Sequence, residues 1–128
     1  MQNQIVIDAS AILALLKMEE GHKKIAERLD DAIISSVNFS EVITVIARHG
    51  FGTEEVVKSL KNTFLHIVEF NAEQAIIAAA LDKLTRKHGL SLGDRACLAL
   101  AKYKKLPVLT ADKAWKGLDL GVAVQLIR

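Results

Sequence analysis

Five short apolar runs, separated by longer segments with helical periodicity, limit the possible folds of this chain more than any other feature. The runs cover residues Ile5–Ile7, Ala32–Ser35, 66–70, 107–110 and 122–127. The first four are apolar without strict alternation, which is typical of parallel strands covered on both faces. The fifth alternates slightly better, which favours an edge strand. Strands that alternate with helices predict an α/β fold, a three-layer α/β/α domain with a mainly parallel sheet of roughly five strands.

Length and composition favour a single globular unit. The chain has 128 residues without a linker, a repeat or a low-complexity segment, so we expect one domain covering residues 1–128. Apolar residues make up 51% of it, which favours a subunit or partner interface. No apolar run approaches the roughly 18 residues that span a bilayer, and no signal-peptide pattern opens the chain, so no membrane association is expected. The single cysteine, Cys97, predicts a buried apolar residue and suits a reducing, cytoplasmic location.

Charge is distributed unevenly along the chain. Residues 1–82 hold 7 Lys/Arg against 12 Asp/Glu, a net −5, whereas residues 83–128 hold 10 against 3, a net +7. A basic C-terminal third indicates contact with phosphates, although solvated surface lysines are the commoner explanation. Two of its three acids are Asp94 and Asp112, which predicts a specific role for both.

Four acids fall at junctions between predicted elements. Asp8 directly follows the first strand, and Asp112 follows the fourth by two residues. Glu41 and Asp94 are expected in the first turn of their helices. Because ligands of such sheets bind beyond the carboxyl ends of the strands, where helix N-termini also lie, all four acids are predicted at one edge.

Each acid also has a purely structural interpretation. Asn38 lies three residues before Glu41, and Ser91 lies three before Asp94. Both pairs have the spacing of a capping box, in which the acid returns a hydrogen bond to the cap residue. The acids that follow strands could likewise cap a helix or start a turn.

Convergence of the four acids distinguishes a functional site from these alternatives. Two unit charges about 4 Å apart repel by about 4 kcal/mol at an effective dielectric near 20. Either the acids take up protons or a cation neutralises them, and all-oxygen ligands suit Mg²⁺ or Mn²⁺. The four histidines are scattered away from these junctions. An acidic metal site beside basic surface predicts phosphodiester chemistry.

Several segments, in their order and spacing, resemble a known family. They are "IVIDASAILALL", "SSVNFSEV", "HGLSLGDRACLALAKYKKLPVLTAD" and "GVAVQLI". Together they are similar to PIN-domain ribonucleases, specifically VapC-type toxins of toxin–antitoxin pairs, over the whole chain. The resemblance implies a PIN-like fold and metal-dependent endoribonuclease activity that inhibits growth or translation.

The resemblance also implies roles for particular residues. The catalytic set would be Asp8, Glu41, Asp94 and Asp112. Asp8 and Asp94 would bind the metal directly, Asp112 would complete the site directly or through water, and Glu41 would orient metal-bound water. Ser10 and Thr110 match positions that support these carboxylates by hydrogen bonds, although both could be ordinary turn residues.

Three further residues need separate interpretation. Trp115 stands where a phenylalanine is more usual, which indicates a change of packing. Asp119 precedes the last strand in a Gly-flanked turn and is left out of the acidic set. Arg95 is assigned either to a surface ion pair or to contact with RNA or a partner protein.

The partners that the resemblance implies are single-stranded or looped RNA, a VapB-like antitoxin that covers the active-site groove, and a second copy of the chain. Two other functions remain open. One is a PIN fold without catalysis that binds RNA or protein, which would be marked by the loss of one of the four acids. The other is a receiver-like phosphoacceptor domain, which would require paired acids after the first strand.

Overall fold

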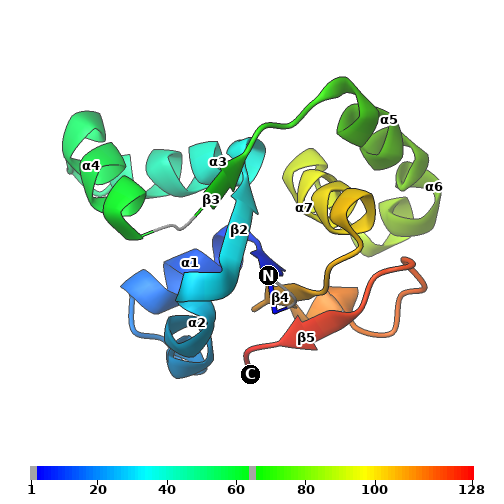
Figure 1. Ribbon diagram of the computed structural model, residues 1–128, viewed down its shortest axis with the longest axis horizontal. Coiled ribbons are helices and arrows are strands. Elements are labelled where there is room, and N and C mark those ends of the chain that lie inside the picture. Colours follow the sequence, from blue (N-terminus) through cyan, green and yellow to red (C-terminus); the bar gives the residue numbers. More distant parts are fainter. Residues whose placement is uncertain (1–2, 64–65) are drawn as a thin grey trace.

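A parallel sheet forms the middle layer of the molecule, as the computed structural model of residues 3–63 and 66–128 shows (Figure 1). Its strands are β1 (Ile5–Ile7), β2 (Ala32–Ser35), β3 (His66–Val68), β4 (Val108–Thr110) and β5 (Val124–Leu126). They lie in the order β3-β2-β1-β4-β5, and every pair of neighbours is parallel. The predicted parallel five-stranded sheet is confirmed.

Helices cover both faces of this sheet (Figure 1). One layer consists of α1 (Ala9–Leu16), α2 (His22–Arg28), α3 (Ser36–Ala47) and α4 (Thr53–Thr63). The other consists of α5 (Ala72–Ala80), α6 (Asp82–Thr85) and α7 (Leu92–Lys104). The connections also contain the 3₁₀ turns η1 (Leu29–Asp31), η2 (Arg86–His88) and η3 (Lys113–Trp115). The three-layer α/β/α architecture is therefore confirmed.

Two apolar cores lie on opposite faces of the sheet because successive strand residues point in opposite directions. Ile5 and Ile7 of β1 pack in the core beneath α1 to α4, whereas Val6 packs in the core beneath α5 to α7. Cys97 is fully buried in the second core, as predicted for a small apolar side chain. No helix of the described residues combines the length and the apolar character needed to cross a bilayer.

Some predicted boundaries need correction. The last three strands are shorter than their apolar runs, because only the residues that pair with a neighbouring strand belong to the sheet. His66 of β3 is exposed, so this strand is not covered on both faces as predicted. It lies at one edge of the sheet, and β5 lies at the other edge as expected. The helical segment between β3 and α7 is divided into α5, α6 and η2.

The order of the strands determines where a ligand can bind. Connections from β1 lead to β2 and β3 on one side, whereas β4 and β5 lie on the other side of β1. The direction in which the chain adds strands to the sheet therefore reverses between β1 and β4. In open α/β sheets, ligands bind at such a point, beyond the carboxyl ends of the strands.

Gly21, between α1 and α2, packs tightly against the C-terminal part of the chain. It has a left-handed backbone with φ of +91°, and a Cβ atom there would clash with the backbone carbonyl oxygen of Ile127. We predict that Gly21→Ala lowers the free energy of unfolding by about 3 kcal/mol, because it adds left-handed strain and steric overlap. Urea denaturation measures this.

Gly50→Ala is the matched control, since Gly50 has a similar φ of +96° and no atom within 4 Å of the added Cβ. It should cost only the backbone strain, about 1 kcal/mol. Equal losses in the two variants would contradict the packing of Gly21 against Ile127.

Candidate active site

Asp8 occupies the central position at the carboxyl edge of the sheet. It directly follows β1, next to β4, where the strand order changes direction. Because side chains alternate along a strand, the Asp8 side chain lies on the same face of the sheet as Val6, and Val6 points toward α7. Asp8 is only 3% exposed. A carboxyl group is thus buried at the point where the fold predicts a ligand.

Neutral donors satisfy the Asp8 carboxylate. Thr110, the last residue of β4, donates its hydroxyl to Oδ2 at 2.6 Å, and the backbone N–H of Ala11 donates to Oδ1 at 2.9 Å. The Ser10 hydroxyl lies 2.8 and 2.9 Å from the two oxygens. Asp8 therefore does cap α1, as its structural interpretation required, but its second oxygen faces β4. Neither ion pair found among the described residues involves Asp8.

Burial dominates the ionisation of Asp8. Desolvation raises the pKa of Asp8 to about 6, and the hydrogen bonds from Thr110, Ala11 and Ser10 only partly oppose it. The negative charge of Asp94 raises the pKa further. A buried carboxylate without a cationic partner is poorly stabilised, so a bound cation would favour its ionised form.

Glu41 lies deeper in its helix than predicted. Helix α3 begins at Ser36 directly after β2, and Ser35 caps it by accepting a hydrogen bond from the N–H of Val37. Glu41 is therefore in the second turn, and Asn38 is not a cap residue. The Asn38 side chain instead donates to Oε1 of Glu41 at 2.7 Å. The capping-box interpretation of this pair is wrong because the helix starts earlier than the apolar periodicity indicates.

Asp94 is in the first turn of α7, as predicted. Its backbone N–H donates to the Ser91 hydroxyl at 3.1 Å, and its Oδ2 accepts from the N–H of Ser91 at 2.9 Å. This pair is a capping box, so the structural interpretation of Asp94 is confirmed. It uses only one carboxylate oxygen, and the side chain stays partly exposed.

Asp112 is connected to Asp8 through Thr110. The N–H of Asp112 donates to the Thr110 hydroxyl oxygen at 3.0 Å, and that hydroxyl donates to Asp8. The Asp112 side chain caps η3 by accepting from the N–H of Ala114 at 2.9 Å. This turn carries Trp115 into the core beneath α7, where it is fully buried. Its indole Nε1 has no hydrogen-bond partner among the described residues.

The electrostatic environment of Cys97 involves three of the predicted acids. Burial raises the pKa of the Cys97 thiol well above its usual range, and the charges of Asp8, Asp94 and Glu41 add to this effect. The charges of three of the predicted acids thus act on the same buried thiol. Across the described ranges, however, no three His, Cys, Asp or Glu side chains already form a cluster that could hold a metal ion.

The chemistry of the donors nevertheless fits a hard divalent cation. Glu41, Asp94 and Asp112 each engage one oxygen in a local hydrogen bond. No bond to their second oxygens is found in the part of the chain that the structure describes. Free carboxylate oxygens around a buried carboxylate are the ligands that Mg²⁺ and Mn²⁺ prefer.

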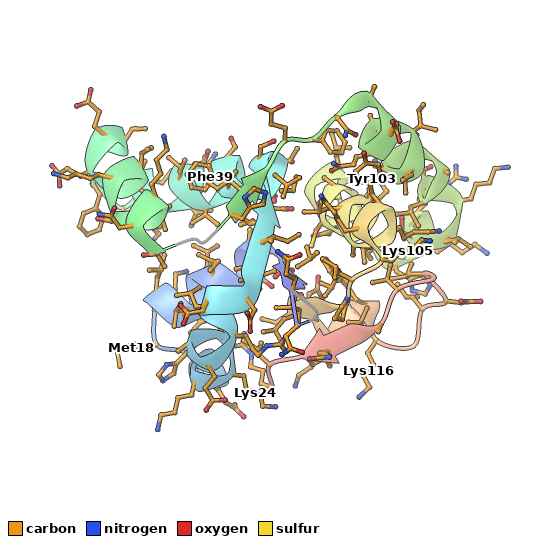
Figure 2. The ribbon with its side chains drawn as sticks, viewed as in Figure 1. Met18, Lys24, Phe39, Tyr103, Lys105 and Lys116 are labelled. Atoms are coloured by element: carbon orange, nitrogen blue, oxygen red, sulfur yellow. The ribbon has the colours of Figure 1, made fainter. Side chains whose placement is uncertain are left out.

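Cationic residues of the last third do not form one surface around this site. Lys102, Lys104 and Lys105 end α7, and at 1.5 Å per residue Lys104 lies about 15 Å along the helix from Asp94. Lys105 and Lys116 lie apart, beside the end of α7 and near β5 respectively (Figure 2). Arg95 directly follows Asp94, and Lys113 and Lys116 closely follow Asp112; of these three cations, both lysines are exposed.

Arg95 forms no ion pair with any described residue, and its side chain is not directed freely into solvent. It is half-buried, and its Nη1 donates to the backbone carbonyl of Ala78 at 3.0 Å, tying α7 to α5. Its Nε is buried without a partner among the described residues. The ion-pair interpretation is therefore wrong.

Comparisons with known proteins agree with this architecture. The family model described as PIN domain matches residues 5–120. No curated protein sequence matches the chain.

Three solved structures illustrate the likeness. A chain of a toxin–antitoxin complex from Klebsiella pneumoniae is 20% identical, with a TM-score of 0.74 and 98% of each chain covered. A chain of DNA-bound VapBC from Salmonella typhimurium is 15% identical, with a TM-score of 0.73 and 98% of each chain covered. VapC20 from Mycobacterium tuberculosis, described as a sarcin–ricin-loop-cleaving toxin, is 17% identical, with a TM-score of 0.73. That match covers 90% of this chain and 96% of VapC20. At these identities the likeness shows a shared fold.

The raised pKa of Asp8 predicts a characteristic dependence of stability on pH. An unfolded aspartate titrates near 3.8 and the folded one near 6, so the folded state binds the proton more tightly. The stability that proton binding to Asp8 contributes to the folded state is present at pH 4 and is lost as pH rises through 6. In chelator, the free energy of unfolding of the wild type minus that of Asp8→Asn should fall by roughly 2 to 3 kcal/mol between pH 4 and pH 7. Urea denaturation at each pH measures it, and a constant difference would contradict the burial of the charge.

Proposed function

Because the chain belongs to the PIN-domain family, we propose that it is a metal-dependent endoribonuclease and the toxin of a VapBC-type toxin–antitoxin pair. The observation that carries this proposal is Asp8, a buried carboxylate where the strand order reverses. Its described hydrogen-bond donors are neutral, and the charge of Asp94 raises its pKa. Such a carboxylate costs stability unless a cation or a proton neutralises it. A structural cap alone would not require burial.

Each acid has a role that follows from its position. Asp8 and Asp94 would hold Mg²⁺ or Mn²⁺, and Asp112 would contribute directly or through water. When bound, a divalent cation stabilises the negative charge of the phosphate and lowers the pKa of water. Glu41, whose Oε1 is held by Asn38, orients the attacking water through Oε2.

Two groups of residues support the acids. One group holds the Asp8 carboxylate in place, and the other attracts the substrate. Ser10 and Thr110 fix the direction of the Asp8 oxygens, so no reorganisation is needed when a phosphate arrives. Lys113 and Lys116 attract the phosphates of RNA next to Asp112. Specificity for a looped RNA is supported by the fold shared with VapC20, which is described as cleaving the sarcin–ricin loop.

The two other functions are less well supported. A phosphoacceptor receiver has the strand order 2-1-3-4-5, whereas this sheet has the order 3-2-1-4-5. A PIN fold without catalysis would be marked by the loss of an acid, and all four acids are present. Hydrolysis is therefore the favoured activity.

An antitoxin and a second copy of the chain are the proposed protein partners. Two of the similar structures are described as a toxin–antitoxin complex and as VapBC. Apolar surface suitable for such partners is present: Leu16, Met18 and Phe51 are 46%, 74% and 58% exposed. Leu16 and Phe51 line a groove of about 500 Å³ between α1, α3 and α4, and Met18 lies at the end of α1 (Figure 2). Exposed apolar surface of this kind usually marks protein interfaces.

We predict that the purified protein cleaves RNA with Mg²⁺ or Mn²⁺ and that chelator abolishes cleavage. Asp94→Asn should reduce the rate at least about 100-fold, because it removes a ligand charge, yet stay folded because the amide oxygen can still accept the hydrogen bond from the backbone N–H of Ser91. Asp119→Asn is the matched control, an exposed acid of the same basic region outside the acidic set. Gel assays measure cleavage, and circular dichroism checks the fold. Parental activity of Asp94→Asn would refute the assignment of Asp94.

Expression of the wild type alone should arrest bacterial growth, and co-expression of a small adjacent gene product should relieve the arrest. Asp94→Asn should leave growth unaffected at equal protein levels. Growth curves with immunoblots measure both effects. Harmless expression of an active, soluble nuclease would contradict the toxin function while leaving the nuclease activity intact.

A further inference from the structure

Glu41 is held against α7 by an unusually close contact with Gly93. An ideal Cβ atom built on Gly93 would lie 2.5 Å from Oε2, 2.6 Å from Oε1 and 2.7 Å from Cδ of Glu41. Ordinary contacts of this kind lie at about 3.5 to 4 Å. Only glycine therefore lets the Glu41 carboxylate approach the first turn of α7, directly before Asp94.

Asn38 holds the same carboxylate by a hydrogen bond. Its Nδ2 donates to Glu41 Oε1 at 2.7 Å and to the backbone carbonyl of Gly93 at 3.0 Å. One amide group thus joins α3 to α7 at the carboxyl edge. Because both partners are acceptors, they also fix which end of the amide faces them.

The energetic balance at Asn38 indicates that this contact serves more than stability. Asn38 is only 1% exposed, and its Oδ1 is buried without a partner among the described residues. An unsatisfied buried carbonyl costs about 1 to 3 kcal/mol. Gly93 also lowers the helix propensity of α7 by about 1 kcal/mol relative to alanine. Asn38 and Gly93 therefore each cost stability, and both contact the carboxylate of Glu41.

We propose that Gly93 and Asn38 are positioning residues for Glu41, which place its carboxylate beside Asp94 for the reaction; this inference rests on the proposed nuclease function. Gly93 provides the space, and Asn38 supplies the hydrogen bond that keeps the flexible side chain in it. Neither residue contacts the reacting atoms. A displacement of the carboxylate by about 1 Å is enough to reduce a rate by about 100-fold.

The decisive variant is Gly93→Ala. The added methyl group meets the far end of a flexible side chain, so Glu41 moves and the backbone stays in place. We expect kcat to fall by at least about 10-fold with KM unchanged, while Tm is equal to or above that of the wild type. Gly52→Ala is the matched control, because a Cβ atom there would meet the Glu55 carboxylate at an ordinary 3.6 Å. It should keep wild-type kcat.

A double-mutant cycle separates positioning from a general effect on α7. In a Glu41→Ala background, measured under single-turnover conditions with excess protein, Gly93→Ala should change the rate by less than about 2-fold. Asn38→Ala should likewise lower kcat in the wild type and have little effect in Glu41→Ala. Wild-type kcat in Gly93→Ala, or an equal loss in both backgrounds, would overturn the proposal.

Thermal unfolding tests the contact without any reference to activity. The Tm shifts of Asn38→Ala and Glu41→Ala should be non-additive, because each variant alone removes the bond between them. An inactive wild type with non-additive Tm shifts would overturn the nuclease function and retain the contact. Additive shifts in an active protein would overturn the positioning role of Asn38 alone.

Discussion

The hydrogen bond from Thr110 to Asp8 is the interaction on which the rest of the site depends. It joins the ends of β1 and β4, the two strands between which the sheet changes direction, and it holds a carboxylate that is almost fully buried. Because the donors are hydroxyl and amide groups, they orient the carboxylate without neutralising it. The edge of the sheet therefore keeps a negative potential, which the neighbouring charge of Asp94 increases.

Much of this arrangement can be predicted from the sequence because it follows from strand geometry. Parallel strands end at a common edge, so an acid that directly follows an apolar run, such as Asp8, must lie there. The capping box of Asp94 is equally local, since Ser91 and Asp94 lie within one helical turn. The layers follow from the alternation of strands and helices, which explains why they were predicted correctly although several strand ends and the edge position of β3 were not.

Contacts between elements could not be predicted in the same way. Helix α3 begins at Ser36 because Ser35, the last residue of β2, caps it, and this shifts Glu41 from the first turn to the second. Asn38 and Glu41 do form a hydrogen bond at this spacing, but both lie inside α3 as neighbours on one helix face, and neither caps the helix. The contact of Glu41 with Gly93 joins residues 52 positions apart, and a glycine at the start of α7 was its only signal. Similarly, Arg95 contacts a carbonyl group of α5 that no local pattern indicates.

Trp115 gives the molecule a built-in optical probe. It is the only tryptophan of the chain, it is fully buried, and it ends the 3₁₀ turn that Asp112 caps. Any rotation of the Asp112 side chain away from its bond to Ala114 would loosen this turn and change the surroundings of the indole ring. Intrinsic fluorescence can therefore follow events at the carboxyl edge without a label, and its emission spectrum belongs to a single known chromophore.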